Sequence, residues 1–161
     1  MLKRENNLIL IVILFFVSLV LISAFVIEYG LNHQPCKLCT YERIPYIFSI
    51  LIIIQILFVK KYEKITLFIL FLIFIASAVL AFYHFGIEQG FFSESFVCKV
   101  GDLSGTLSKE QLLEQLNKKN SISCKEVNFR IFGLSLAAIN TILSIILSVI
   151  FLKLFLNYAK N

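Results

Sequence analysis

Cys36 and Cys39 are the residues of this chain best suited to redox chemistry, because only two residues separate them. A disulfide across so short a loop removes little chain entropy and has strained geometry, which are properties of a labile redox bond. Two further cysteines, Cys98 and Cys124, lie far apart in the sequence, and they fit a structural staple and an exchanging pair about equally well. Four thiols permit three pairings, and the sequence leaves the pairing open.

Cys39 is predicted to be the more acidic thiol of the close pair. It stands where an apolar helical span begins, and the free N–H groups and the dipole of a helix N-terminus favour a thiolate. Arg43 follows one helical turn later, at i+4, where it can add a full positive charge. Composition alone equally allows Arg43 to be an interfacial anchor for the helix.

Zinc binding is the competing chemistry for these cysteines. A Cys-x-x-Cys pair with two more thiols could form a tetrahedral zinc site, and His33 is nearby in the sequence. However, Cys98 and Cys124 lack the short spacing of a second zinc knuckle, and thiols on the outer side of a membrane tend to oxidise. We therefore expect no metal site.

The elements that must position these cysteines are membrane helices. Of the 161 residues, 59% are hydrophobic and only 16% are charged, a balance that excludes a soluble monomer. Because lipid offers no partners to the backbone, apolar stretches of about 20 residues are read as spanning helices. The sequence predicts a single membrane domain over residues 1–161, with spans at about 8–27, 42–59, 65–85 and 131–156.

Two predicted loops hold all four cysteines on one side of the membrane, at about 28–41 and 86–130. Within the second loop, Ser108 and Gln111 form a capping box ahead of three leucines that share one helical face. The predicted fold class is therefore an all-α membrane protein, a four-transmembrane-helix bundle with a short amphipathic helix in the second outer loop.

The charge pattern predicts the orientation of the bundle. The two termini and the turn between spans two and three carry seven Lys or Arg and two Glu, whereas the cysteine side carries equal numbers of basic and acidic residues. Dense positive charge in short segments marks the cytoplasmic side. We therefore expect both termini in the cytoplasm and the cysteines in an oxidising compartment, and we explain the net charge of +5 by topology, with no nucleic-acid partner.

The run from Cys36 to Arg43, Cys-Lys-Leu-Cys-Thr-Tyr-Glu-Arg, lies between two apolar spans and precedes a separated cysteine pair in the second outer loop. This arrangement resembles the DsbB family of membrane disulfide-generating quinone reductases over nearly the whole topology. The segment Tyr83-His84-x-Gly86-x-Glu88 is similar to short members of that family. The resemblance implies a bacterial inner-membrane protein with periplasmic cysteine loops, a quinone cofactor (ubiquinone or menaquinone) and a soluble DsbA-like thioredoxin-fold oxidase as partner.

The resemblance also implies a role for each cysteine. The partner's thiol would attack Cys98, Cys124 would then attack Cys36, and the freed Cys39 thiolate, supported by Arg43, would pass an electron pair to the quinone. His84 ends the third span at about the depth of Cys39, where it could hydrogen-bond the quinone or donate a proton, although a solvated interfacial histidine is equally compatible with its position. Glu88 is a weaker candidate.

Two other classes of function remain open from the sequence. A quinone-linked reductase of the vitamin K epoxide type also uses cysteines at helix edges, although the order and spacing of its pairs fit less well. A disulfide-stapled or zinc-binding membrane scaffold would need no enzymatic activity at all.

Overall fold

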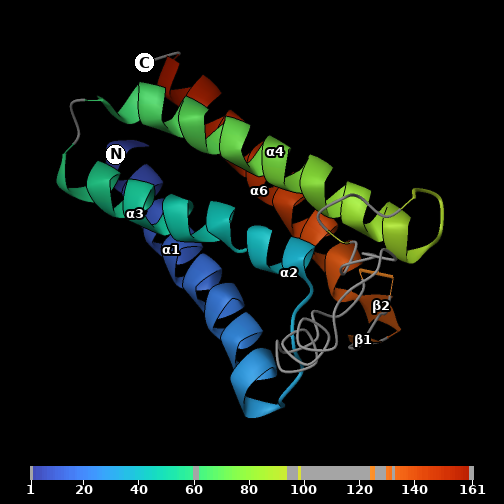
Figure 1. Cartoon of the computed structure of the whole chain (residues 1–161). Helices are drawn as coiled ribbons and strands as arrows, with labels where there is room; N and C mark the ends of the chain where they lie inside the picture. The colour runs from blue at the N-terminus through green and yellow to red at the C-terminus, as the bar shows by residue number, and fades with distance from the viewer. Residues whose placement is uncertain are drawn as a thin grey trace, which may run out of the picture.

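The computed structural model describes residues 2–59, 62–93, 98, 124–125, 130–131 and 133–159. In that part of the chain, four helices are long and apolar enough to cross a membrane, at Asn7–Gly30, Lys37–Phe58, Glu63–Glu88 and Leu136–Tyr158. The predicted fold class, a four-helix membrane bundle, is confirmed. Figure 1 shows the N- and C-termini at one end of the bundle and the helix that carries the close cysteine pair at the other. The predicted amphipathic helix after Ser108 lies outside the described residues.

The first span consists of α1 (Leu2–Phe25) and a π-helical turn, η1 (Val26–Gly30). The π turn is held by the N–H of Leu31, which donates to the carbonyl of Val26 at 3.1 Å. It extends the helix three residues beyond the predicted end at 27. Single π turns are frequent at functional sites because they redirect side chains, and η1 carries Glu28.

The second span begins earlier than predicted and is interrupted. We expected it to start at 42, after a loop over 28–41, but α2 (Lys37–Tyr41) is already helical and α3 (Ile44–Phe58) follows. Hydropathy missed α2 because its Cys-x-Leu-Cys run is short and polar at its flanks. The break falls at Glu42 and Arg43, ahead of Pro45, which lacks an N–H and is tolerated only in the first turn of α3.

The third span, α4 (Glu63–Glu88), is slightly longer than the predicted 65–85. It ends where Gly90 takes a positive φ of 78°, and the N–H groups of Phe91 and Phe92 then donate to the carbonyl of Gly86. A Cβ on Gly86 would lie 2.1 Å from the Phe92 ring, so only glycine allows this close return of the chain.

The fourth span begins later than predicted. The short strand β1 (Arg130–Ile131) pairs antiparallel with β2 (Leu134–Ser135), and the helix α6 covers Leu136–Ala159 instead of 131–156. The φ of Gly133, 83°, turns the chain. The Ser135 hydroxyl then accepts the N–H of Ala138 at 3.2 Å, which satisfies a free donor of the first helical turn.

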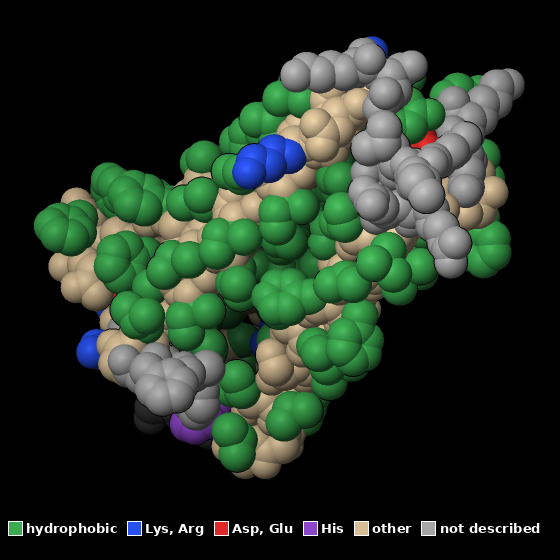
Figure 2. Space-filling model, turned by 180° about the vertical axis from the view of Figure 1, so that it is seen from behind, with side chains coloured by type: hydrophobic (Ala, Val, Ile, Leu, Met, Phe, Trp, Pro, Cys, Tyr) green, Lys and Arg blue, Asp and Glu red, His purple; other side chains and the backbone are tan. Residues whose placement is uncertain are grey.

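α4 and α6 make the most extensive helix contact of the described residues. Part of the face of α6 that meets α4 consists of small residues, which lets two membrane helices approach closely. The small buried residues of α6 include Ala137, Thr141, Ser144 and Ser148. Farther along the helix, the larger Phe151 stacks on Phe74 of α4. Ser77 and Ser144 are 3.1 Å apart across the contact. Figure 2 shows that hydrophobic side chains dominate the outer surface, as a lipid-facing surface requires.

Candidate active site

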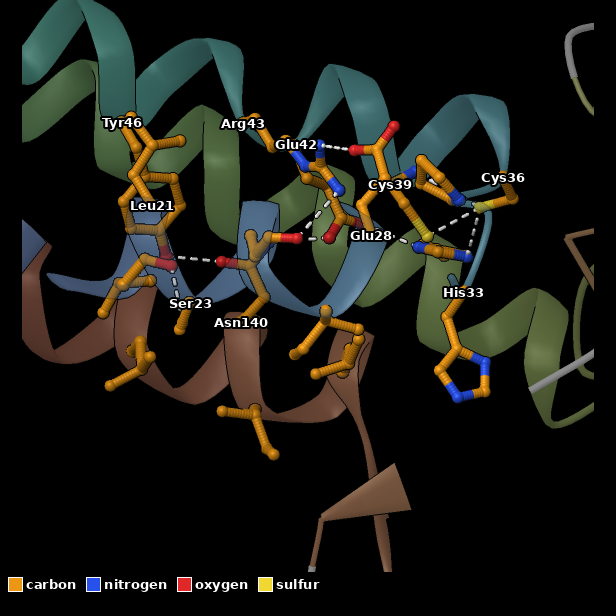
Figure 3. Close-up of a pocket in the computed structure, with 18 of the residues that line it drawn as sticks. Leu21, Ser23, Glu28, His33, Cys36, Cys39, Glu42, Arg43, Tyr46 and Asn140 are labelled. Atoms are coloured by element: carbon orange, nitrogen blue, oxygen red, sulfur yellow. Dashed lines mark hydrogen bonds and ion pairs between the residues drawn. The ribbon is translucent and has the colours of Figure 1, made fainter. Parts of the chain in front are cut away.

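A cavity of about 280 Å³ lies at the cysteine end of the bundle, between α1 and α6, with its other walls from α2, α3 and α4. Most of its wall is apolar, and polar side chains extend along it from Tyr46 and Asn140 to Cys36 (Figure 3). The apolar members are Val20, Leu21, Ala24, Ile27, Leu136, Ile139 and Leu143. The polar members include four of the predicted site residues, Cys36, Cys39, Arg43 and His84.

Cys36 and Cys39 are free thiols with their Sγ atoms 2.8 Å apart. Cys36 is buried and is the N-cap of α2, where its Sγ accepts the backbone N–H of Cys39 at 3.2 Å. Cys39 is half-buried on the first turn of the same helix. The short helix α2 thus places both sulfurs on one side, facing α4 and the cavity.

The second cysteine pair is joined to the first by packing. Cys98 and Cys124 form a disulfide, which settles the pairing that the sequence left open. Both are buried in one cluster with Cys36, Leu38 and Ile87, and Cys39 packs against this cluster. All four predicted cysteines therefore meet at the same end of the bundle.

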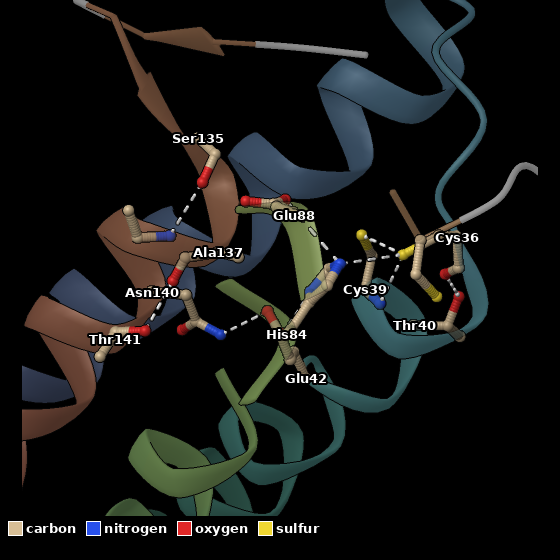
Figure 4. Close-up of polar contacts among 12 residues, drawn as sticks. Cys36, Cys39, Thr40, Glu42, His84, Glu88, Ser135, Ala137, Asn140 and Thr141 are labelled. Carbon is tan, nitrogen blue, oxygen red and sulfur yellow. Dashed lines mark hydrogen bonds and ion pairs between the residues drawn. The ribbon is translucent and has the colours of Figure 1, made fainter. Parts of the chain in front are cut away.

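A chain of buried hydrogen bonds leads from Cys36 into the bundle (Figure 4). The Nε2 atom of His84 lies 3.5 Å from the Cys36 Sγ, and its Nδ1–H donates to Glu42 Oε1 at 2.7 Å. Asn140 donates to the other Glu42 oxygen at 2.7 Å, and the Tyr46 hydroxyl donates to Asn140. Cys36, His84 and Glu42 are arranged as the nucleophile, base and orienting acid of a cysteine-based triad would be.

The sequence suggested that Arg43 lies against Cys39, but the structure places it elsewhere. Its guanidinium pairs with Glu28 of η1 and lies over the Phe25 ring, 5.1 Å from the ring centre. The break between α2 and α3 turns Arg43 toward the first span, so the i+4 argument, which needs an unbroken helix, fails. Arg43 still lines the cavity.

The contacts that favour a thiolate belong to Cys36 and not, as predicted, to Cys39. The pKa of Cys36 is lowered from its ordinary value, because the Cys39 side chain hydrogen-bonds to its sulfur and His84 adds a hydrogen bond and charge that together outweigh burial. The N-capping geometry explains why Cys36 and not Cys39 is the more acidic thiol, since the backbone N–H of Cys39 donates to the Cys36 sulfur.

The remaining predicted residues have different positions. Glu88 lies one turn after His84, with its Oε1 3.8 Å from the His84 Nε2, and its other oxygen, Oε2, is buried without a hydrogen-bond partner among the described residues. His33 also lines the cavity, but Figure 3 shows its ring pointing away from the two sulfurs.

Comparison with known proteins decides the family. The sequence model of one family, described as "Disulfide bond formation protein DsbB", matches residues 6–154. The chain belongs to the DsbB family. It is also 30% identical to a protein of Rickettsia prowazekii (strain Madrid E) described as "Uncharacterized protein RP370", over 161 residues that cover 99% of this chain and 93% of the relative. Together with its four apolar helices, membership makes the chain a multi-pass membrane oxidoreductase of disulfide formation.

Sequence reasoning missed two acidic residues of this DsbB-family site, Glu42 and Glu28. One signal was available, because an ionisable residue at the start of an apolar span is a candidate functional residue by default. Glu42 meets that criterion, and it stands in the quoted run between Cys36 and Arg43. Its connection to His84 is a tertiary contact between α4 and the α2–α3 break, which spacing does not predict.

We predict a high alkylation rate for Cys36 even at a pH below the ordinary thiol pKa. The rate is measured in a variant whose sole thiol is Cys36, made by the substitutions Cys39→Ser, Cys98→Ala and Cys124→Ala. Alkylation follows the thiolate, and a lowered pKa keeps the thiolate populated at lower pH. Adding His84→Ala should move the pH profile of the rate upward, toward an ordinary thiol. A profile unaffected by loss of the imidazole would contradict the assigned contact. Rates are measured with iodoacetamide and mass spectrometry.

Proposed function

We propose that this chain oxidises the dithiol of a soluble DsbA-like thioredoxin-fold protein and passes the electron pair through its two cysteine pairs to a membrane quinone, either ubiquinone or menaquinone. One observation carries the proposal: both cysteine pairs pack in one buried cluster, and Cys36 and Cys39, which we call the inner pair, line a largely apolar cavity between membrane helices. Cys36, Cys39, Cys98 and Cys124 are the proposed catalytic residues, with Arg43, His84 and Cys39 at the quinone.

The cavity fits a quinone ring. Its apolar walls suit the ring faces, while His84 and Arg43 bring hydrogen-bonding groups to the end where the sulfurs lie. The cavity is lined by residues of the membrane helices α1 and α6, and we propose that an oil-soluble molecule enters it from the lipid between them. A bound quinone supplies the acceptor for two electrons.

Thiol–disulfide exchange moves the electrons to this site. The partner's thiolate attacks Cys98, forms a mixed disulfide and releases Cys124 as a thiolate. Cys124 attacks Cys36 of the Cys36–Cys39 disulfide, and Cys39 leaves as a thiolate in the cavity wall. The partner's second thiol closes the partner's disulfide, and Cys98 re-forms its bond with Cys124, which frees Cys36. Membership of Cys36, Cys98 and Cys124 in one buried cluster supports exchange between the two pairs.

His84 handles protons at the inner pair. Its Nδ1–H is fixed on Glu42, so Nε2 offers a lone pair toward the Cys36 sulfur. When Cys36 and Cys39 re-form their disulfide, their two electrons would pass to a bound quinone, the imidazole would accept the Cys36 proton, and Glu42 would stabilise the imidazolium. The proton then leaves from Nε2 toward the cavity. Each turnover takes two electrons and two protons from the partner's dithiol.

We further propose that the chain lies in a bacterial inner membrane with both termini in the cytoplasm. The two chain ends lie together in Figure 1, opposite the helix that carries the close cysteine pair. The segments on that side have a net positive charge, with seven Lys or Arg against two Glu, whereas the cysteine side has equal numbers of basic and acidic residues. This places the sulfurs where partner dithiols need oxidation.

Anaerobic mixing tests the function. Purified protein, a reduced DsbA-like thioredoxin-fold protein and a water-soluble short-chain ubiquinone are combined without oxygen, and quinone absorbance is followed together with free partner thiols. The proposal expects one quinone reduced for each partner disulfide formed, with no reduction when either protein is left out. Partner oxidation without quinone loss would overturn it, as would an unreacted partner.

We predict that Arg43→Ala raises the apparent KM for quinone by about tenfold, the equivalent of one lost hydrogen bond of about 1.4 kcal/mol. The fold should persist, because Arg43 is partly exposed and pairs with a single carboxylate. Lys37→Ala is the matched control, because Lys37 is an exposed cation on α2 that does not line the cavity. Steady-state kinetics at varied quinone concentration measures both variants, and an unchanged KM in Arg43→Ala would remove this residue from the quinone site.

A further inference from the structure

Three side chains that line the cavity have the donor atoms of a metal site. The ligand atoms of Cys36, Cys39 and His84 all lie within 4.8 Å of one another. Glu88 lies outside that group, with its Oε1 3.8 Å from the His84 Nε2, so its carboxylate must move toward the sulfurs to become a fourth ligand. The side chain of Glu88 is only 7% exposed, and its Oε2 has no hydrogen-bond partner among the described residues. A buried carboxylate oxygen without a partner is costly, and either a proton or a cation offsets that cost.

The distances fit zinc. Zn–S and Zn–N bonds of about 2.3 and 2.05 Å at a tetrahedral angle place a sulfur about 3.5 Å from a nitrogen ligand. The Cys36 Sγ is 3.5 Å from the His84 Nε2. The two sulfurs, now 2.8 Å apart, would have to separate by about 1 Å, to the 3.8 Å of two zinc ligands. Rotation of the half-buried Cys39 side chain supplies that movement.

The histidine is also oriented as a zinc ligand. Zinc-bound histidines usually donate their second N–H to a carboxylate, which fixes the tautomer and strengthens the ligand. His84 does this toward Glu42 at 2.7 Å, and Asn140 holds Glu42 from the other side. The lone pair of Nε2 therefore faces the sulfurs before any metal arrives.

We propose that the reduced Cys36–Cys39 pair, together with His84 and Glu88, binds one Zn²⁺ ion, and that this binding reversibly blocks the redox site. Two thiols release two protons and become zinc-bound thiolates, with the imidazole and the carboxylate as third and fourth ligands. Oxidation of both thiolates to the disulfide removes two electrons and both sulfur ligands, so zinc leaves. The site therefore exists in one redox state only, unlike a zinc-binding scaffold.

Two arguments from the sequence stood against a metal site. The missing second zinc knuckle concerned Cys98 and Cys124, which are disulfide-bonded and are not ligands here. The tendency of outer thiols to oxidise restricts the site to the reduced form of the Cys36–Cys39 pair. His33, the histidine that the sequence offered as a ligand, points away from the sulfurs (Figure 3). The proposed ligands come from α2, with its N-cap Cys36, and from α4. His84 and Glu88, at i and i+4 of α4, take the place of the second closely spaced ligand pair that a zinc knuckle would provide.

Zinc affinity in two redox states tests the proposal. The full chain with Cys98→Ala and Cys124→Ala retains only Cys36 and Cys39 as thiols, and wild-type protein is measured in parallel. Each is reduced, or oxidised with diamide, which takes up the electron pair. Competition against a chromophoric zinc chelator should give one zinc per reduced chain, with affinity at least about 100-fold lower after oxidation. Cobalt substitution should give the sulfur-to-metal charge-transfer band and tetrahedral visible bands.

Single variants test the other two ligands. His84→Ala and Glu88→Gln, each in the two-thiol chain, should weaken zinc binding by at least about tenfold. His33→Ala is the matched control, because it removes the other histidine of the chain from the same cavity, and it should leave the affinity unchanged. Equal affinity in both redox states would overturn the site, and so would full affinity without His84 or Glu88. No partner or quinone is present, so failure here leaves the proposed function standing.

Discussion

Cys39→Ser is expected to lower the rate of quinone reduction by reduced partner by at least about 10³-fold, because residues that act as one chemical unit cannot replace one another. Its sulfur is the one freed when Cys36 is attacked, and it lies in the cavity wall. Serine preserves the size of the side chain and a hydroxyl that can still hydrogen-bond to Cys36, so the packing of α2 should persist. Absorbance of the quinone under anaerobic conditions measures the rate.

The same variant carries its own control for folding. Cys98 and Cys124 are untouched, and their disulfide remains available to the partner's thiolate. A mixed disulfide between Cys98 and the partner should therefore form in Cys39→Ser, visible on a non-reducing gel. Normal quinone turnover would contradict the role of Cys39, whereas loss of both turnover and mixed disulfide would indicate a damaged fold.

The sequence predicted the helices well where hydropathy alone decides, and poorly where local backbone chemistry does. The first and third spans were placed within a few residues, because a long apolar run in lipid has no stable alternative to a helix. The fourth span was misplaced at its start, since residues 130–135 are apolar enough to join it but Gly133 turns the chain. The second span was misplaced because α2 is capped by the Cys36 sulfur, an N-cap that standard capping residues do not suggest.

For the site, the sequence predicted the residue types and their depth but not their pairing. Cys36, Cys39, Arg43 and His84 do line one cavity, as helices of similar length in one membrane favour. The partner of Arg43 could not be derived, because Glu28 reaches it only through the π turn at the end of α1. The thiol with the lowered pKa was also misassigned. Helix polarity suggested Cys39, whereas the hydrogen bonds converge on Cys36.

Removal of the base should be the second largest effect among the single variants. His84→Ala is expected to lower kcat for quinone reduction by about 10²-fold, within the usual range for a general acid–base group. The Cys36 sulfur would lose its only described imidazole contact, and its proton would have no nearby acceptor. Added imidazole should restore part of the rate by entering the space left by the side chain. An unchanged kcat would place His84 outside the reaction.

The variant Glu42→Gln tests whether the Glu42 carboxylate affects the reaction through His84. Its negative charge stabilises the imidazolium, and its two oxygens bind the His84 ring and Asn140, so replacement by a neutral amide should lower kcat by about tenfold with little change in the quinone KM. If the two residues form one unit, the double variant Glu42→Gln, His84→Ala should be no slower than His84→Ala alone, because a carboxylate without its imidazole has nothing left to orient. Losses that multiply in the double variant would mean that Glu42 acts independently, for example by holding the α2–α3 break through Asn140. If His84→Ala and the double variant react at equal rates, the charge of Glu42 belongs to the proton pathway of Cys36.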